Sequence, residues 1–118
     1  MRVLLATDRP DLGDALRLFL TERVIDVVDV VADACFLHAR AASLQADVVL
    51  LDWHLGRTIS TQAVADLMRG DAPIPVIVLA GHQEQGRARA SGAAACATLG
   101  DRPGALLAAL HEVAGATS

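Results

Sequence analysis

Two carboxylates stand where short apolar runs of the sequence end. Asp8 comes after the run 3–6, and Asp52 comes directly after the run 48–51. Such runs are typical of strands buried on both faces of a parallel sheet, which binds ligands outside the carboxyl ends of its strands. Neighbouring carboxylates repel, and Mg²⁺ relieves the repulsion through oxygen ligands. A carboxylate nucleophile beside that cation has the minimum equipment for accepting a phosphoryl group.

The same acids also fit a purely structural role. Carboxylates that follow strands are common as helix caps and as solvated loop residues, and the spacing alone favours neither interpretation. Beside Asp52, we expect Trp53 to be a partly exposed packing residue. We expect His54 to contribute its backbone carbonyl rather than its imidazole.

The elements that would position these residues alternate along the chain. The predicted strands cover residues 3–6, 24–31, 48–51, 76–80 and part of 92–99, and the predicted helices cover 12–20, 34–44, a segment from Thr58 or Ser60 to about 70, and a last segment from Pro103. This alternation predicts an α/β fold with a single doubly wound, five-stranded parallel sheet in the order 2-1-3-4-5, helices on both faces, and a flavodoxin-like topology. The switch point of that order lies between the first and third strands, where Asp8 and Asp52 would meet.

Two segments depart from an ideal pattern. Asp26 and Asp29 interrupt the second predicted strand, which favours a place at the edge of the sheet. The segment from His82 to Ser91 carries Gly86 in its middle and offers no large apolar residue. A fourth helix there would be short or irregular.

Composition narrows the class of protein. The 118 residues suit one domain, 1–118, and 53% are apolar. The net charge is −4 and all ten cations are scattered arginines, so we expect no direct nucleic-acid partner for this segment. Cys35 and Cys96 lie far apart without metal-ligand spacing, which favours a reducing interior. With no signal peptide and no run of about 20 apolar residues, we expect a cytoplasmic protein without a membrane partner.

The whole chain resembles a response-regulator receiver domain. Three segments in register carry the resemblance: the opening VLLATDRP of residues 3–10, the central ADVVLLD of residues 46–52, and IPVIVL of residues 74–79. By this resemblance Asp52 matches the phospho-acceptor and Asp8 the direct magnesium ligand. His54 matches the residue whose backbone carbonyl completes the metal ligands of the protein.

Four positions depart from the pattern of that family. Thr7 stands where a second acid is usual, and Ala80 replaces the hydroxyl residue after the fourth strand. Leu99 replaces the lysine after the fifth strand, and Cys96 replaces the aromatic switch residue. The resemblance therefore implies that any Mg²⁺ site is weak. A phosphorylated acceptor would also lack two partners worth about 1.5–3 kcal/mol each, whereas a full two-state switch needs about 5.5 kcal/mol.

These departures favour an atypical receiver domain that acts as a regulatory interaction module and is phosphorylation-independent or only weakly phosphorylated. Its expected partner is a second copy of the chain or an output domain. The alternative is a working phospho-acceptor, in which a histidine kinase or a small phosphodonor phosphorylates Asp52 with Mg²⁺. A third possibility is a pocket for a small metabolite, with walls from Thr7, Asp8, Asp52, Ala80 and Leu99. We do not expect an independent metabolic enzyme, because no nucleophile–base pair or glycine-rich phosphate loop is visible.

Overall fold

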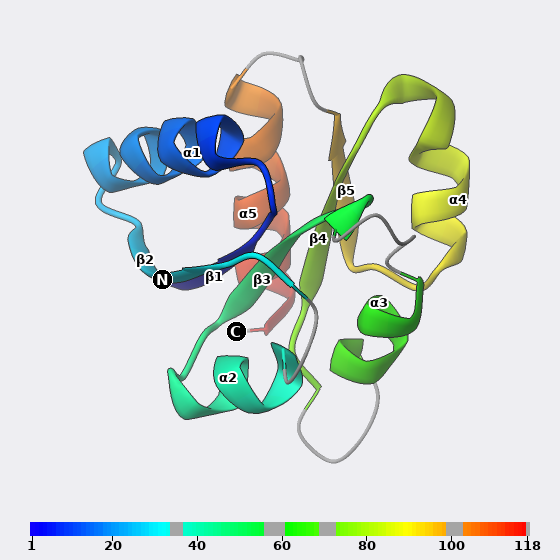
Figure 1. Ribbon diagram of the computed structural model, residues 1–118, viewed down its shortest axis with the longest axis horizontal. Helices are drawn as coiled ribbons and strands as arrows, with labels where there is room; N and C mark the ends of the chain where they lie inside the picture. The colour runs from blue at the N-terminus through cyan, green and yellow to red at the C-terminus, as the bar shows by residue number, and fades with distance from the viewer. Residues whose placement is uncertain (34–36, 56–60, 69–72, 99–102, 118) are drawn as a thin grey trace.

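The computed structural model describes residues 1–33, 37–55, 61–68, 73–98 and 103–117 (Figure 1). In these ranges five parallel strands form one sheet in the order β2-β1-β3-β4-β5, as predicted. The strands are β1 (Arg2–Ala6), β2 (Asp26–Val31), β3 (Val48–Asp52), β4 (Val76–Ala80) and β5 (Ala95–Thr98). The helices are α1 (Pro10–Glu22), α2 (Leu37–Ser43), α3 (Thr61–Met68), α4 (Gln85–Ala90) and α5 (Pro103–Thr117), with a 3₁₀ turn, η2 (His82–Glu84), before α4.

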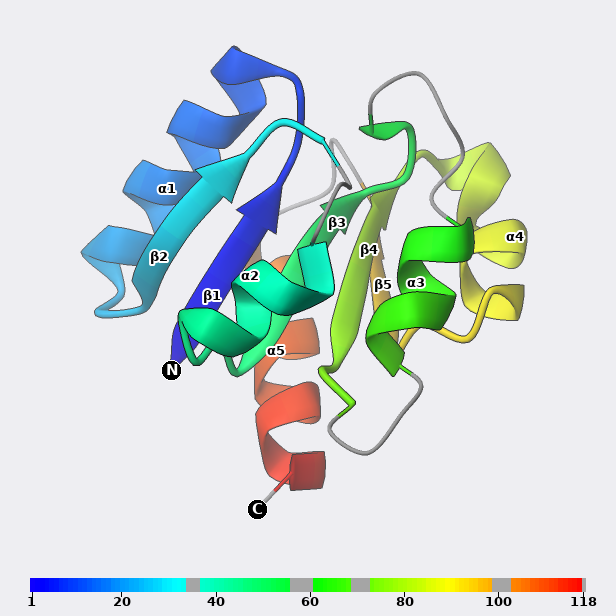
Figure 2. The same cartoon turned by 60° about the horizontal axis from the view of Figure 1, so that its bottom comes forward.

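The helices cover both faces of the sheet, as Figures 1 and 2 show. Alternation along the strands separates two buried clusters. In β1, Val3 and Leu5 face the layer that contains α1 and α5, whereas Leu4 and Ala6 face the layer that contains α2, α3 and α4. Each fully buried Val or Leu side chain contributes about 1.5–3 kcal/mol relative to exposure. The predicted doubly wound architecture is confirmed.

The three central strands are buried along nearly their whole length. Every residue of β3 and β4 is buried, and in β1 only the first residue is exposed. Such continuous burial explains why the sequence shows unbroken apolar runs instead of alternation. These runs fix the edge at which β1 and β3 both end, because the two strands pair in parallel with Ala6 opposite Leu51.

The edge strand β2 begins two residues later than predicted. Val24 lies in the turn after α1, at φ 61°, and is 92% exposed. A β-branched residue in that conformation is strained and cannot continue a strand. β2 pairs only with β1, which confirms the expected edge position, and its register shifts between Val3 and Leu4.

The segment after β4 is as irregular as predicted. It holds the 3₁₀ turn η2 and the six-residue helix α4, in which Ala88 is the buried residue. Gly92 follows at φ 100°, a left-handed conformation that ends the helix, so β5 starts only at Ala95. The expected cap at Thr58 or Ser60 and the position of Leu99 lie outside the described residues.

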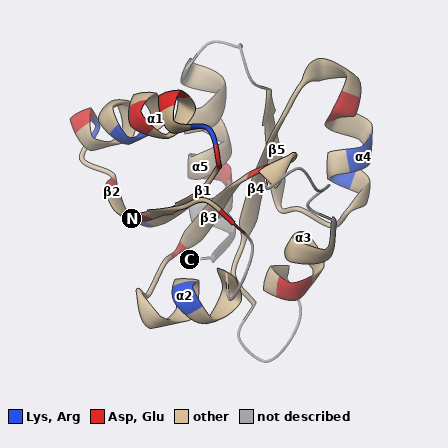
Figure 3. Ribbon diagram, viewed as in Figure 1, with Lys and Arg blue, Asp and Glu red and all other residues tan. Residues whose placement is uncertain are grey.

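Charge is spread over the described surface (Figure 3). Basic and acidic positions alternate along α1, and further basic positions lie on α2 and α4. At the edge strand, Asp29 is paired with Arg40 of α2. None of the helices in the described ranges has both the length and the apolar character of a membrane span.

Candidate functional site

Asp52 ends β3 at the switch point of the sheet. Its side chain is only 1% exposed, although it lies at the carboxyl edge of the strands. On one side β3 pairs with β4, with Asp52 opposite Leu79, and the backbone N–H of Trp53 continues this ladder to the Leu79 carbonyl over 3.0 Å. The backbone therefore holds the carboxylate in a defined position, where a buried charge requires polar partners.

From the described residues, two donors reach the Oδ2 atom of Asp52. The Thr7 hydroxyl donates over 3.0 Å and the Arg9 Nε–H donates over 3.0 Å. The other oxygen, Oδ1, accepts from the backbone N–H of His54 over 3.2 Å. These bonds to a charged acceptor are the stronger kind and together stabilise the carboxylate in its buried position.

Thr7 is positioned by both neighbouring strands. Its backbone N–H donates to the Val31 carbonyl of β2 over 2.9 Å, and its side chain is buried. Its hydroxyl also accepts from the backbone N–H of Arg9 over 3.2 Å. The hydroxyl is therefore held between the first loop and Asp52, at the position where the receiver family usually has an acid.

Arg9 is a site residue that the sequence analysis missed. Its guanidinium forms an ion pair with the buried Asp52. Its carbonyl accepts the N–H of Gly13 over 3.0 Å at the start of α1, which anchors the backbone. The sequence did offer one signal for this role, because the cation Arg9 directly follows Asp8, the acid at the end of the first strand.

Asp8 is exposed, whereas Thr7 before it is buried. It lines a cavity of about 230 Å³ between the start of α1 and the end of β2, together with Thr7, Arg9, Asp14 and Arg17 among other residues. Asp52 is not part of that lining. Within the described ranges, no three His, Cys, Asp or Glu side chains come close enough to hold a metal ion.

The arrangement does not fit a divalent metal at Asp52. Magnesium prefers carboxylates, carbonyls and water, whereas here the Oδ2 atom faces a hydroxyl and a guanidinium. The residue before Asp8 supplies no second charge, because it is Thr7. A metal at Oδ2 would have to displace Arg9, a like charge 3.0 Å from the oxygen that it would bind.

Ala80 is the last residue of β4 and Cys96 is the second residue of β5; that they are altered switch positions stays a prediction. Ala80 is buried and has no side-chain hydroxyl, and its carbonyl accepts from Gln85 Nε2 over 3.2 Å. Gln85 also reaches the Ala97 carbonyl over 3.4 Å, so α4 is tied to both strands by a residue that the sequence analysis missed. Cys96 is half-buried opposite Val78, and burial raises the pKa of its thiol.

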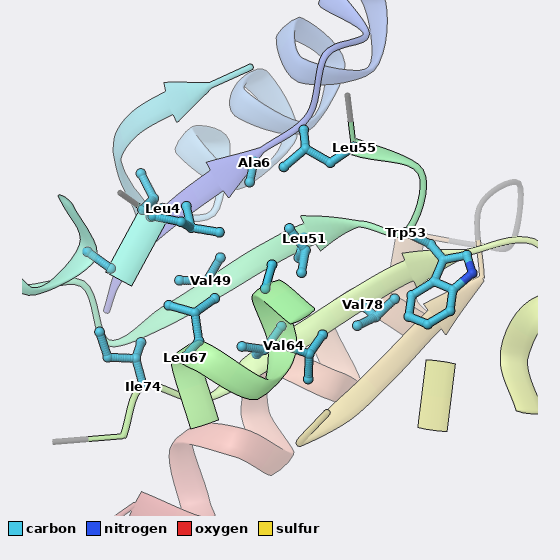
Figure 4. Close-up of a cluster of buried hydrophobic side chains, with 14 of the residues drawn as sticks. Leu4, Ala6, Val49, Leu51, Trp53, Leu55, Val64, Leu67, Ile74 and Val78 are labelled. Carbon is cyan, nitrogen blue, oxygen red and sulfur yellow. The ribbon is translucent and has the colours of Figure 1, made fainter. Parts of the chain in front are cut away.

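Trp53 is not a partly exposed residue, as we had expected, but is fully buried at 1% exposure. Figure 4 shows its indole beyond the end of β3, beside Val78. It belongs to the cluster that contains Ala80 and Ala88, and Cys96 packs against that cluster. The indole Nε1–H finds no hydrogen-bond partner among the described residues.

The imidazole of His54 also has a contact that was not predicted. Its Nε2 atom forms a close ion pair with Glu84 of η2. This pair joins the loop after β3 to the turn after β4 across the carboxyl edge of the sheet. The expected role of the His54 carbonyl as a metal ligand stays a prediction.

The comparisons with known proteins point to one fold. No family model and no curated protein matches the sequence. The BeF₃-activated N-terminal receiver domain of Klebsiella pneumoniae RstA is 24% identical, covers 94% of this chain and 96% of its own, and has a TM-score of 0.81. A LuxR-family two-component response regulator from Aurantimonas sp. SI85-9A1 is 24% identical, with coverage of 97% and 85% and a TM-score of 0.84.

The signal receiver domain of the putative response regulator NarL from Mycobacterium tuberculosis is 21% identical, with coverage of 97% and 96% and a TM-score of 0.82. Each likeness extends over nearly the whole chain, and the strand order and helix placement described above agree with it. At these identities the likeness establishes the fold and leaves the chemistry to the residues themselves. This chain has the fold of a response-regulator receiver domain.

Proposed function

We propose that this chain is an atypical receiver domain that acts as a regulatory interaction module, and that phosphorylation of Asp52 is not its signal. The observation that carries this proposal is the engagement of Asp52 Oδ2 by Thr7 and Arg9, each at 3.0 Å. A phosphoryl acceptor has to present a free carboxylate oxygen to the incoming phosphorus. In this domain, attack through Oδ2 would first have to break two bonds to a buried charge.

The residues that would report a phosphoryl group support the same proposal. Ala80 has no hydroxyl with which to meet a phosphoryl oxygen, and the sequence contains no lysine at any position. The contacts that normally differ between an inactive and an active state are therefore missing. A modification without differential contacts cannot shift a conformational equilibrium.

The partner that we propose is a second copy of the chain or an output domain. Among the neighbouring structures, the RstA domain is an N-terminal receiver domain, and a DNA-bound RcsB structure contains a chain of which 66% is covered by the match. These proteins place a receiver fold beside further protein. By analogy, the domain described here would act through docking and not through an enzymatic reaction.

A working phospho-acceptor remains the second candidate because of one observation. The guanidinium of Arg9 lies beside Asp52, where it could also pair with phosphoryl oxygens in place of the missing lysine. In that case Asp52 would take the phosphoryl group from a histidine kinase or a small donor, with Mg²⁺ in the pocket. The two candidates differ in what a phosphodonor does to the protein.

The test incubates the purified domain with acetyl phosphate and Mg²⁺, then measures its intact mass and its oligomeric state by light scattering. We expect no gain of a phosphoryl group and an unchanged oligomeric state over a range of protein concentrations. The Asp52→Asn variant should have the same oligomeric state, with Asp11→Asn on the exposed start of α1 as the matched control. A mass gain with a change of oligomeric state, both abolished by Asp52→Asn, would establish the second candidate instead.

A further inference from the structure

We propose that the guanidinium of Arg9 is the resident cation of the acid pocket and excludes divalent metal ions from Asp52. This inference rests on the proposed function, because it assigns the mechanism by which the pocket is kept out of metal-dependent phosphotransfer. It starts from the misfit between this pocket and magnesium. The fold offers a carboxylate at its switch point, but the protein fills the position beside it with one of its own side chains.

The geometry supports a dedicated contact. Arg9 Nε lies 3.0 Å from Asp52 Oδ2, the same oxygen that receives the Thr7 hydroxyl. The Asp52 side chain is 1% exposed and that of Arg9 is 50% exposed. The negative charge of Asp52 is thus buried, whereas the Arg9 side chain that compensates it is partly in solvent. A buried carboxylate that lost this partner would attract another cation.

The backbone holds Arg9 in place for this role. Its N–H donates to Thr7 Oγ1 over 3.2 Å and its carbonyl accepts from Gly13 over 3.0 Å. The guanidinium is therefore tethered next to its carboxylate at a high effective concentration. A free metal ion must compete with that tethered cation and must also shed water to bind.

Thr7 favours Arg9 over a divalent metal ion at Asp52. An acid at this position would add negative charge and favour a divalent ion over a single guanidinium. The hydroxyl adds none, so one carboxylate is balanced by one arginine. Asp8 is exposed and lines a cavity together with Thr7 and Arg9, so it would be a second carboxylate near any metal that replaced Arg9.

Neutralising Arg9 should therefore create a metal site. In the Arg9→Gln variant, we expect Mg²⁺ and Mn²⁺ to bind on the order of 10- to 100-fold more tightly than in the unaltered domain. Mn²⁺ binding is followed by loss of its free-ion electron paramagnetic resonance signal, and Mg²⁺ binding by the fluorescence of Trp53, the single tryptophan. Neither readout depends on phosphorylation.

Arg23→Gln is the matched control, because it removes the same charge at the other end of α1, outside the cavity that Asp8 and Arg9 line. It should leave metal affinity unchanged if the contact, and not the net charge, is responsible. The double variant Arg9→Gln/Asp52→Asn should lose the gained affinity. Arg9→Lys keeps the positive charge but replaces the planar guanidinium with an ammonium group, so this variant should bind metal with intermediate affinity. It provides a second measurement if Arg9→Gln does not fold.

Equal metal affinity of the Arg9→Gln variant and the unaltered domain would overturn the inference, whether both bind weakly or both tightly. So would a gain that survives Asp52→Asn. A failure of this inference is distinct from a failure of the proposed function. The latter would appear as a phosphoryl mass gain on the unaltered domain, which the metal titrations do not measure.

Discussion

The Thr7 hydroxyl donates a 3.0 Å hydrogen bond to Asp52 Oδ2 and so joins the ends of β1 and β3 at the switch point of the sheet. Both side chains are buried. A second acid at this position would repel Asp52 in the absence of a metal, whereas a hydroxyl stabilises it. The pocket is thus complete without a bound ion, which supports a role that does not depend on one.

Thr7→Val tests the contribution of this hydroxyl. Valine has a similar shape but cannot donate, so Asp52 loses one of the bonds to its buried charge. We expect the free energy of unfolding to fall by about 1.5–3 kcal/mol in urea denaturation followed by circular dichroism. Thr21→Val, on the exposed surface of α1, is the control and should change stability by less than about 0.5 kcal/mol. Equal effects of the two substitutions would show that the bond is weak.

Glu84→Gln tests the contact between His54 and Glu84. The pair joins the loop after β3 to η2, and α4 has few buried side chains that could hold it otherwise. Since exposed ion pairs contribute little, we expect amide hydrogen exchange in residues 82–90 to accelerate by at most about fivefold. The control is Glu112→Gln on the exposed part of α5. Acceleration well beyond fivefold in residues 82–90 would contradict the small contribution expected of this pair.

The sheet and the position of Asp52 were predictable because both depend on local pattern. The buried runs 3–6, 48–51 and 76–80 specify the central strands, and alternation with helices limits the order of the strands. Asp52 follows from the end of one such run. The weakness of the segment 82–91 was also visible, since Gly86 and the lack of large apolar residues are properties of that segment alone.

The contacts of Arg9 and the burial of Trp53 were not predictable in the same way. Whether Arg9 reaches Asp52 depends on the backbone at the start of α1, which the hydrophobic pattern does not specify. Trp53 is buried in a cluster whose members come from strands and helices far apart in the sequence. The space that the indole fills is formed by segments distant in the sequence, so no single segment predicts it.

Asp29→Asn gives a prediction for pH. The Arg40 guanidinium, through its hydrogen bond to Asp29, holds the pKa of this carboxyl below its ordinary value of 3.8. A lowered pKa in the folded state means that the carboxylate contributes stability above the unfolded value, and that this contribution is lost as pH falls through the folded value.

We therefore expect Asp29→Asn to lower the free energy of unfolding at pH 7 by less than about 1 kcal/mol, and the difference from the unaltered domain to shrink as pH falls below 3.8 and through the folded-state pKa. Urea denaturation at a series of pH values measures it. Asp26→Asn on the same strand is the control, since the ion pair of Asp26 with Arg2 is longer, at 3.6 Å, and exposed. A difference that does not change with pH would contradict the assigned cause.

The thiol of Cys96 should react slowly. Burial raises its pKa, and Arg89 partly offsets the rise. Because the thiolate is the reactive form, the pH of half-maximal reaction with a disulfide reagent should be higher for the folded protein than for the urea-unfolded one. Cys35→Ser gives a single-thiol background for this measurement. Arg89→Gln should shift the midpoint further upward, and Arg87→Gln on the same helix should not. An equal midpoint in the folded and unfolded protein would contradict the role of burial.

The buried indole of Trp53 gives the last prediction. Trp53→Ala removes a fully buried ring and should lower the free energy of unfolding by about 3–5 kcal/mol. Trp53→Phe keeps a ring and removes an Nε1–H that has no partner among the described residues, and burying such a group costs about 1–3 kcal/mol. The two effects oppose each other, so we expect Trp53→Phe to be the milder change, below about 1.5 kcal/mol. Urea denaturation followed by circular dichroism measures both variants, and the fluorescence of the unaltered domain should shift to longer wavelength on unfolding. Equal destabilisation by phenylalanine and alanine would show that the Nε1–H is satisfied in solution.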